Sequence, residues 1–216
     1  MKVNTGEAVG LIGPNGAGKT TAFNLVVGVY KPSEGKVIFD NEDITGLPPN
    51  EICKKGIGRT FQVVKPFGKM TVLQNIMAGA FVNTAKTQEA RQIASEVMEK
   101  MGLQSKRDKL AASLTIPERK RLEMAKALAT RPKLMLLDEV LAGLNPTEIQ
   151  DAVLLIKSMI KDGVTILMIE HVLQATMAIC ERIVVLNYGQ KLAEGTPEQV
   201  TGNEEVIKAY LGDDYA

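Results

Sequence analysis

Three predominantly apolar runs occur along the chain, at residues 8–12, 134–137 and 164–169. Runs of this length without regular polar alternation are typical of strands buried on both faces of a parallel sheet. Residues 20–27 follow the first run with a helical pattern. A helix after the middle run is indicated by one apolar stripe, formed by Ile149, Ala152, Val153, Ile156, Met159 and Ile160. Strands that alternate with helices predict an α/β fold with a mostly parallel sheet.

The pattern between about residues 64 and 130 is helical instead. Ala94, Val97, Met98 and Met101 repeat at intervals of three, four and seven residues, as on one face of a helix. Further elements are predicted as a strand at residues 35–40, a hairpin formed by residues 183–186 and 191–194, and a helix at residues 204–211. We expect one domain, residues 1–216, with an α/β core (1–62 and 132–216) and an inserted helical subdomain (63–131).

The composition fits a single globular domain with no strongly charged partner. Of the 216 residues 45% are hydrophobic, and 26 basic and 25 acidic residues give a net charge of +1, so no basic surface favours nucleic acid. Two cysteines without CxxC spacing and one histidine argue against a zinc site and predict reduced thiols. We also expect no membrane-spanning segment and, because residues 1–6 lack a signal-peptide core, a protein that stays inside the cell.

A glycine-rich pattern follows the first predicted strand. It consists of Gly13, Pro14, Asn15, Gly16, Ala17, Gly18, Lys19, Thr20 and Thr21, and satisfies G-x-x-x-x-G-K-[ST] between a strand and a helix. Glycines let successive N–H groups turn toward phosphate oxygens, and the helix N-terminus adds a positive dipole end. The sequence therefore predicts a site for ATP or GTP, with Lys19 on the β- and γ-phosphates and Thr20 on Mg²⁺.

Two carboxylates end the predicted strand at residues 134–137. Asp138 is expected to hold Mg²⁺, and Glu139 is the candidate general base that orients the water attacking the γ-phosphate. An Asp-Glu pair at a strand end is on its own more typical of a solvated pair or a helix cap. The nearby phosphate-binding pattern favours the catalytic interpretation.

His171 and Gln62 complete the candidate site. The single histidine follows the strand at residues 164–169, and the carboxyl ends of parallel strands converge at one edge of a sheet, so we expect His171 to contact the γ-phosphate. Gln62, which ends the segment Arg59-Thr60-Phe61-Gln62, could contact Mg²⁺ or the attacking water. Without the other motifs, both residues would be interpreted as structural or surface positions.

In this order and spacing, the motifs resemble the ATP-binding subunits of ABC transporters over nearly the whole chain. The resemblance implies a P-loop NTPase core with an incomplete N-terminal antiparallel β region, and ATP and Mg²⁺ as cofactors. It also implies a second ATPase subunit that pairs head to tail with this chain, so that the pair encloses two ATP molecules. Transmembrane permease subunits would hold the protein on the cytoplasmic face of the plasma membrane.

The subgroup is indicated by residues 56–62, 66–67, 70–72, 142–146 and 194–197, which look most like the ATPases of branched-chain amino acid importers. ATPases of lipopolysaccharide export share several of these features. Two other readings stay open: a soluble ABC ATPase that acts on DNA or ribosomes, and a P-loop kinase for a small molecule.

The family's LSGGQ signature is altered here. Its counterpart is Leu114 followed by Thr115, Ile116, Pro117 and Glu118, which the resemblance expects to face the ATP of the partner subunit. Pro117 lacks the N–H that a glycine would offer, and Glu118 adds a negative charge. Thr115 and Glu118 also fit an ordinary capping box at a helix start. We expect the ATP site that this signature completes to be weakened, and hence the partner to be homologous but not identical. Asn145 also favours such a partner, because many relatives have aspartate at this position.

Two further expectations concern the N-terminus and the charged segments. By this resemblance, strands and an adenine-stacking aromatic residue usually precede the phosphate loop, but only twelve residues precede Gly13 here. Either the natural start lies upstream, which we favour, or the purine is held less firmly. The basic segments 106–109 and 119–121 are expected to be solvated helix faces, although the second could touch nucleotide or partner.

Overall fold

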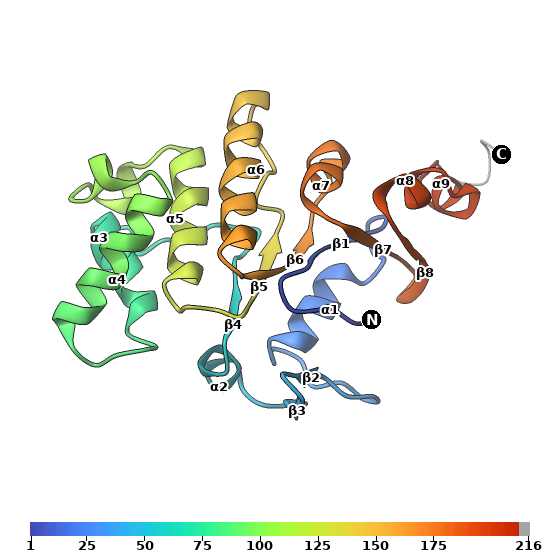
Figure 1. The fold of residues 1–216 in the computed structure, drawn as a ribbon, viewed down its shortest axis with the longest axis horizontal. Coiled ribbons are helices and arrows are strands. Elements are labelled where there is room, and N and C mark those ends of the chain that lie inside the picture. Colours follow the sequence, from blue (N-terminus) through green and yellow to red (C-terminus); the bar gives the residue numbers. More distant parts are fainter. Residues whose placement is uncertain (212–216) are drawn as a thin grey trace.

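A six-stranded sheet forms the centre of the computed structural model, which describes residues 1–211 (Figure 1). Residues 212–216 of the predicted core lie outside the described residues. The strand order is β4-β5-β6-β1-β7-β8. These strands are β1 (Ala8–Ile12), β4 (Ile57–Arg59), β5 (Leu134–Asp138), β6 (Thr165–Ile169), β7 (Arg182–Asn187) and β8 (Gln190–Gly195).

All neighbouring strands in this sheet are parallel except β7 and β8, which form the predicted hairpin. Ile169 at the end of β6 pairs with Leu11 of β1 on one side and with Asp138 of β5 on the other. The carboxyl ends of these three strands therefore lie level at one edge of the sheet. The α/β class and the mostly parallel sheet are confirmed.

Helices cover both faces of the sheet. Figure 1 shows α1 (Lys19–Val26) and α2 (Pro49–Lys54) on one face, and α5 (Ile116–Leu128), α6 (Pro146–Lys161) and α7 (Leu173–Ile179) on the other. Successive side chains of β5 alternate between the two cores: Leu136 packs with Phe23 of α1, whereas Met135 and Leu137 belong to the core that contains α6. This double burial explains why the strand sequence is continuously apolar.

The helical segment beside β4 consists of α3 (Val72–Ala80), α4 (Thr87–Lys100) and α5, with short 3₁₀ turns at Gln104–Lys106 and Ala111–Ser113. The side chains of Ala94, Met98 and Met101 are buried, as their spacing predicts. At Gly79 of α3 an added Cβ would lie 2.2 Å from the carbonyl oxygen of Lys126. Glycine at this position therefore lets α3 and α5 approach closely.

The predicted strand at residues 35–40 is shorter than expected. It forms only β2 (Ile38–Phe39), which pairs with β3 (Glu42–Asp43) in a separate antiparallel hairpin. Asp40 and Asn41 have φ values of 52° and 63°, so the turn already begins at Asp40. Ile38 is 58% exposed, because no further strand lies beside it among the described residues.

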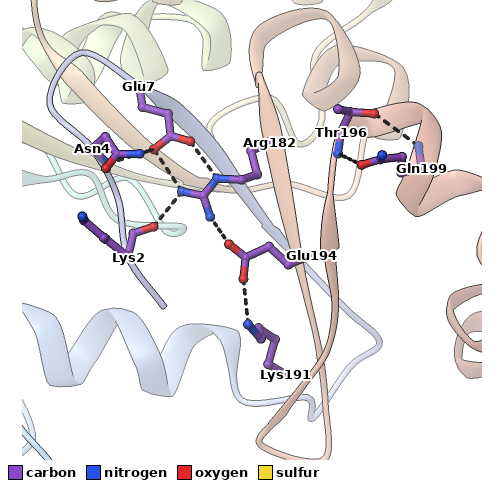
Figure 2. A network of polar contacts seen from close by, with 8 residues as sticks. All are labelled: Lys2, Asn4, Glu7, Arg182, Lys191, Glu194, Thr196 and Gln199. Carbon is purple, nitrogen blue, oxygen red and sulfur yellow. Dashed lines mark hydrogen bonds and ion pairs between the residues drawn. The ribbon is translucent and has the colours of Figure 1, made fainter.

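Arg182, the first residue of β7, ties the N-terminal segment to β7 and β8 (Figure 2). Its Nε donates to Glu7 Oε1 at 2.7 Å, and its Nη2 donates to the carbonyl oxygen of Lys2 at 2.7 Å. Arg182 also pairs with Glu194 of β8, which accepts from Lys191. The hydrogen bond from Arg182 lowers the pKa of Glu7. This network fixes the entrance to β1, the strand that leads into the phosphate loop.

The C-terminal part adds α8 (Pro197–Thr201) and α9 (Glu204–Leu211) beside the β7–β8 hairpin. Thr196 and Gln199 form a capping box at the start of α8, which Figure 2 includes. None of the helices within residues 1–211 has the length and apolar character that a membrane crossing requires.

Candidate functional site

The phosphate loop lies between β1 and α1. Gly13, Gly16 and Gly18 have φ values of 151°, 80° and 97°, and a Cβ at Gly13 would lie 2.1 Å from the carbonyl oxygen of Leu186. α1 begins at Lys19 after Gly18, which has no side chain to cap the first-turn N–H groups. These donors remain available for an anion at the positive end of the helix dipole.

Lys19 folds back onto this loop. Its Nζ donates to the carbonyl oxygens of Gly13 at 2.7 Å and Pro14 at 3.0 Å, and the residue is only 7% exposed. Burial lowers the pKa of Lys19, and the charges of Glu139 and Asp138 oppose that shift. The ammonium group therefore lies in the field of both carboxylates, while Thr20 and Thr21 beside it are exposed.

Asp138 is the last residue of β5 and is 1% exposed. Its Oδ2 accepts from Arg59 Nη2 at 2.9 Å, and its backbone N–H donates to Thr60 Oγ1 at 3.0 Å. The other carboxylate oxygen, Oδ1, has no hydrogen-bond partner in the structure. Mg²⁺ prefers carboxylate, hydroxyl and amide oxygens, and this free oxygen, the Thr20 hydroxyl and the Gln62 amide are of these types.

Glu139 joins the other two candidate residues. Its Oε1 lies 3.0 Å from His171 Nε2, and its Oε2 accepts from Gln62 Nε2 at 2.7 Å. The Glu139 side chain is 14% exposed, whereas that of His171 is 47% exposed. The structure thus brings Gln62 and His171, from distant parts of the sequence, to the carboxylate of Glu139. Strand topology predicts this meeting for Glu139 and His171.

The altered signature begins α5 and stands apart from this group. Thr115 is the N-cap residue, and Glu118 accepts from its backbone N–H at 2.9 Å, so the predicted capping box is present. Lys106 pairs with Glu118 at 2.7 Å and lowers its pKa. Ile116 is 62% exposed. Within residues 1–211, no hydrogen bond joins residues 115–118 to the phosphate loop, Glu139 or His171.

The expectation that residues 119–121 are a solvated face is wrong for Lys120. This residue is 8% exposed, and its Nζ donates to the carbonyl oxygen of Glu139 at 2.9 Å. Consecutive helix residues point about 100° apart, so one member of a basic triplet can face the core while its neighbours face solvent. Lys106 is likewise paired and not simply solvated. No role was predicted for Arg59 either. Its position three residues before Gln62 was the only indication that it belongs to this site.

Two family models match the sequence. The model described as "ABC transporter" matches residues 1–142, and the model described as "Branched-chain amino acid ATP-binding cassette transporter" matches residues 190–216. The first match includes the phosphate loop, Gln62, the altered signature, Asp138 and Glu139.

Characterised relatives cover the whole chain. The high-affinity branched-chain amino acid transport ATP-binding protein BraF of Pseudomonas aeruginosa is 42% identical, over 99% of this chain and 90% of that protein. The lipopolysaccharide export system ATP-binding protein LptB of Haemophilus influenzae is 40% identical, over 100% of this chain and 90% of that protein. The predicted resemblance is therefore confirmed.

Solved structures agree with the sequence matches. The ADP conformation of MJ1267, an ATP-binding cassette of an ABC transporter, superposes with a TM-score of 0.87 at 31% identity, over 99% of this chain and 91% of that one. A dimeric post-hydrolysis state of the cassette MJ0796, bound to ADP and Pi, gives a TM-score of 0.82 at 26% identity, over 91% and 88% of the two chains. This chain belongs to the ABC transporter family, as an ATP-binding cassette with the fold of an ABC ATPase.

Proposed function

We propose that this chain hydrolyses ATP at the carboxyl edge of its sheet to energise import of branched-chain amino acids. The observation that carries the hydrolytic part is the Glu139 carboxylate, which lies between Gln62 and His171 and whose charge acts on Lys19 of the phosphate loop. A carboxylate held in this way can orient water for attack on the γ-phosphate. Glu139 is then the general base, and His171 and Lys19 contact phosphate.

The nucleotide would be held by the loop from Gly13 to Thr21. Gly16 and Gly18 turn their N–H groups toward the phosphates, and Lys19 exchanges its bonds to the Gly13 and Pro14 carbonyls for phosphate oxygens. Thr20, Asp138 and Gln62 would hold Mg²⁺. When bound there, the ion neutralises charge that develops on the β- and γ-phosphate oxygens.

The working assembly in this proposal contains a second ABC ATPase subunit and transmembrane permease subunits. The dimeric form of the related cassette MJ0796 supports a paired arrangement. We infer that the partner is a homologous, non-identical subunit, and that the permease holds both on the cytoplasmic face of the plasma membrane. Within this chain, residues 63–131 would act as the helical subdomain that transmits closure to the permease, and residues 1–62 and 132–216 as the core.

The cargo is inferred from similarity. BraF is similar over nearly the full chain, and the C-terminal match at residues 190–216 is to a branched-chain amino acid transporter model. LptB, at 40% identity, makes lipopolysaccharide export the second candidate. A soluble ABC ATPase or a small-molecule kinase is less consistent with these relatives, and a kinase would release little phosphate without an acceptor.

The test is purification of the complex from native membranes, followed by reconstitution into liposomes. We expect co-purification of a permease and a second ATPase, ATP-dependent uptake of radiolabelled leucine, and phosphate release without any acceptor. Phosphate release without leucine uptake, together with ATP-dependent release of lipopolysaccharide, would assign the cargo to the second candidate. An ATPase that co-purifies with no membrane subunit would contradict the transport role.

The altered signature predicts a defined gain of activity. Replacing Thr115, Ile116, Pro117 and Glu118 by Ser, Gly, Gly and Gln would restore an N–H donor in place of Pro117 and remove the charge of Glu118. We expect turnover of the assembled transporter to rise by about two- to tenfold, since a single well-placed donor to developing charge has an effect of this order or larger. Thr115→Ser alone, which keeps the cap and the hydroxyl, is the control. Unchanged turnover in the fourfold variant would disprove that this signature is weakened.

A further inference from the structure

The turn that follows β5 is held in an unfavourable backbone conformation. Glu139 has a φ of 50°, in the left-handed region that residues other than glycine, asparagine and aspartate rarely adopt. Such a conformation costs about 1 kcal/mol or more and persists only where the surroundings enforce it. The candidate catalytic residue is itself the strained one, so the groups that enforce its backbone also set the direction of its carboxylate.

Four hydrogen bonds hold this turn, and one of them runs within it, from the N–H of Ala142 to the carbonyl oxygen of Glu139 at 3.3 Å. The N–H of Glu139 donates to the carbonyl oxygen of Ile169 at 2.9 Å, which continues the pairing of β5 with β6. The carbonyl oxygen of Glu139 accepts from Lys120 Nζ at 2.9 Å. The N–H of Leu141 donates to Glu170 Oε1 at 2.8 Å. Two of the four contacts therefore come from charged side chains, one in α5 and one directly after β6.

Both side chains are buried, at 8% exposure for Lys120 and 3% for Glu170. Burial lowers the pKa of Lys120, while the charges of Glu170 and Glu139 oppose this shift. Burial also raises the pKa of Glu170 to about 7, and its Oε2 has no hydrogen-bond partner. Burying such groups is unfavourable unless they are hydrogen-bonded. Their common feature is that each hydrogen-bonds the backbone of the turn that carries Glu139.

We propose that Lys120 and Glu170 are positioning residues for Glu139, and that Lys120 couples this carboxylate to helix α5. The inference rests on the proposed role of Glu139 as general base. Lys120 lies little more than one helical turn after Thr115, at the start of α5, where residues 115–118 are proposed to face the partner's nucleotide. A shift of α5 when the partner site fills would move the ammonium that holds the Glu139 carbonyl, so occupancy of one site would adjust the base of the other.

The first test compares variants of Lys120 in the full chain within its assembled complex. Lys120→Met removes the charged donor to the Glu139 carbonyl, leaves the longer bond from the N–H of Ala142, and preserves the bulk of the side chain. We expect kcat to fall about 10- to 100-fold while KM and the Kd for ATP stay within about twofold, as for a misplaced catalytic group with intact binding. Lys120→Arg should recover most of the loss, because a guanidinium N–H can donate to the same carbonyl.

A matched control is Lys126→Met on the same helix. Lys126 is partly buried, with a side chain that is 19% exposed, and pairs with Glu123 at 3.0 Å, but it makes no hydrogen bond to the turn after β5. The kcat of Lys126→Met should equal that of the unmodified protein, even if its thermal stability falls as much as that of Lys120→Met. Equal losses of kcat in both variants would overturn the proposal, because they would indicate a general effect on the helix.

Other results would also overturn it: an unchanged kcat in Lys120→Met, a parallel loss of kcat and ATP affinity, or no recovery in Lys120→Arg. Should Lys120→Met fail to fold, Glu170 supplies the same comparison, with Glu170→Gln retaining the acceptor for Leu141 and Glu170→Ala removing it. Only the alanine variant should then lose kcat. Full activity of Glu139→Gln would refute the proposed function. That result is distinct from one in which Glu139→Gln is inactive but the Lys120 variants behave alike, which would refute only the positioning role.

Discussion

Glu139→Gln is expected to lower the kcat for ATP hydrolysis by about 10²- to 10⁴-fold, the usual contribution of a positioned general base. The amide is nearly isosteric, so it can still meet Gln62 and His171, but it cannot accept a proton from water. The phosphate loop and Lys19 are untouched. ATP should therefore bind with nearly unchanged affinity and accumulate, unhydrolysed, in a closed pair of ATPase subunits.

The measurement is phosphate release in the assembled complex, with size-exclusion chromatography of the ATPase subunits in the presence of ATP and Mg²⁺. Glu181→Gln is the matched control, because Glu181 is an exposed glutamate just before β7, at the opposite end of the parallel strands from Glu139. It should hydrolyse ATP normally and form no long-lived ATP-bound pair. Normal hydrolysis by Glu139→Gln would remove this residue from the role of base.

Much of the fold was predictable because its central strands are buried on both faces. The apolar run at residues 134–137 became β5, and the run at residues 164–169 became β6, since a buried parallel strand leaves little room for polar residues. β4 was not predicted. It spans only Ile57–Arg59, too short for a periodic pattern, and its pairing with β5 is decided by tertiary contacts.

The candidate site was predictable to the extent that it follows from topology. Asp138 ends a parallel strand and Glu139 and His171 come just after one, so their convergence needs no knowledge of side-chain packing. Lys120 and Glu170 were missed for the opposite reason: each looks like an ordinary surface charge in sequence, and only the packing of α5 and β6 against the turn after β5 buries it. The burial of a charged side chain cannot be recognised from the composition of the sequence or from the spacing of its residues.

Arg59 is another buried charge that the sequence pattern does not reveal, and replacing it is expected to cause the largest change in stability. Its Nη2 pairs with Asp138 Oδ2 at 2.9 Å, and the two side chains are only 9% and 2% exposed. Its Nη1 also donates to Asn24 Oδ1 at 2.6 Å. The guanidinium thus links β4, β5 and α1 around a carboxylate that has no other cation within salt-bridge distance in residues 1–211.

Arg59→Met is therefore expected to lower the free energy of unfolding by about 3–5 kcal/mol, the usual effect of leaving one partner of a buried pair uncompensated. The measurement is urea unfolding without nucleotide or metal. Lys133→Met is the control, because Lys133 pairs with Asp40 where both side chains are more than half exposed, and its effect should stay below about 1 kcal/mol.

The double variant Arg59→Met with Asp138→Asn separates lost charge compensation from lost packing. If the unpaired Asp138 carboxylate causes the instability, neutralising it should recover a large part of the lost free energy, and the two substitutions should not be additive. A loss below about 1 kcal/mol in Arg59→Met would contradict a structural role for the pair. Additive losses in the double variant would instead assign the effect to the other contacts of the guanidinium. These are the hydrogen bond to Asn24 and the rings of Phe23 and Phe61, whose centroids lie 5.8 and 5.2 Å from Arg59 Cζ.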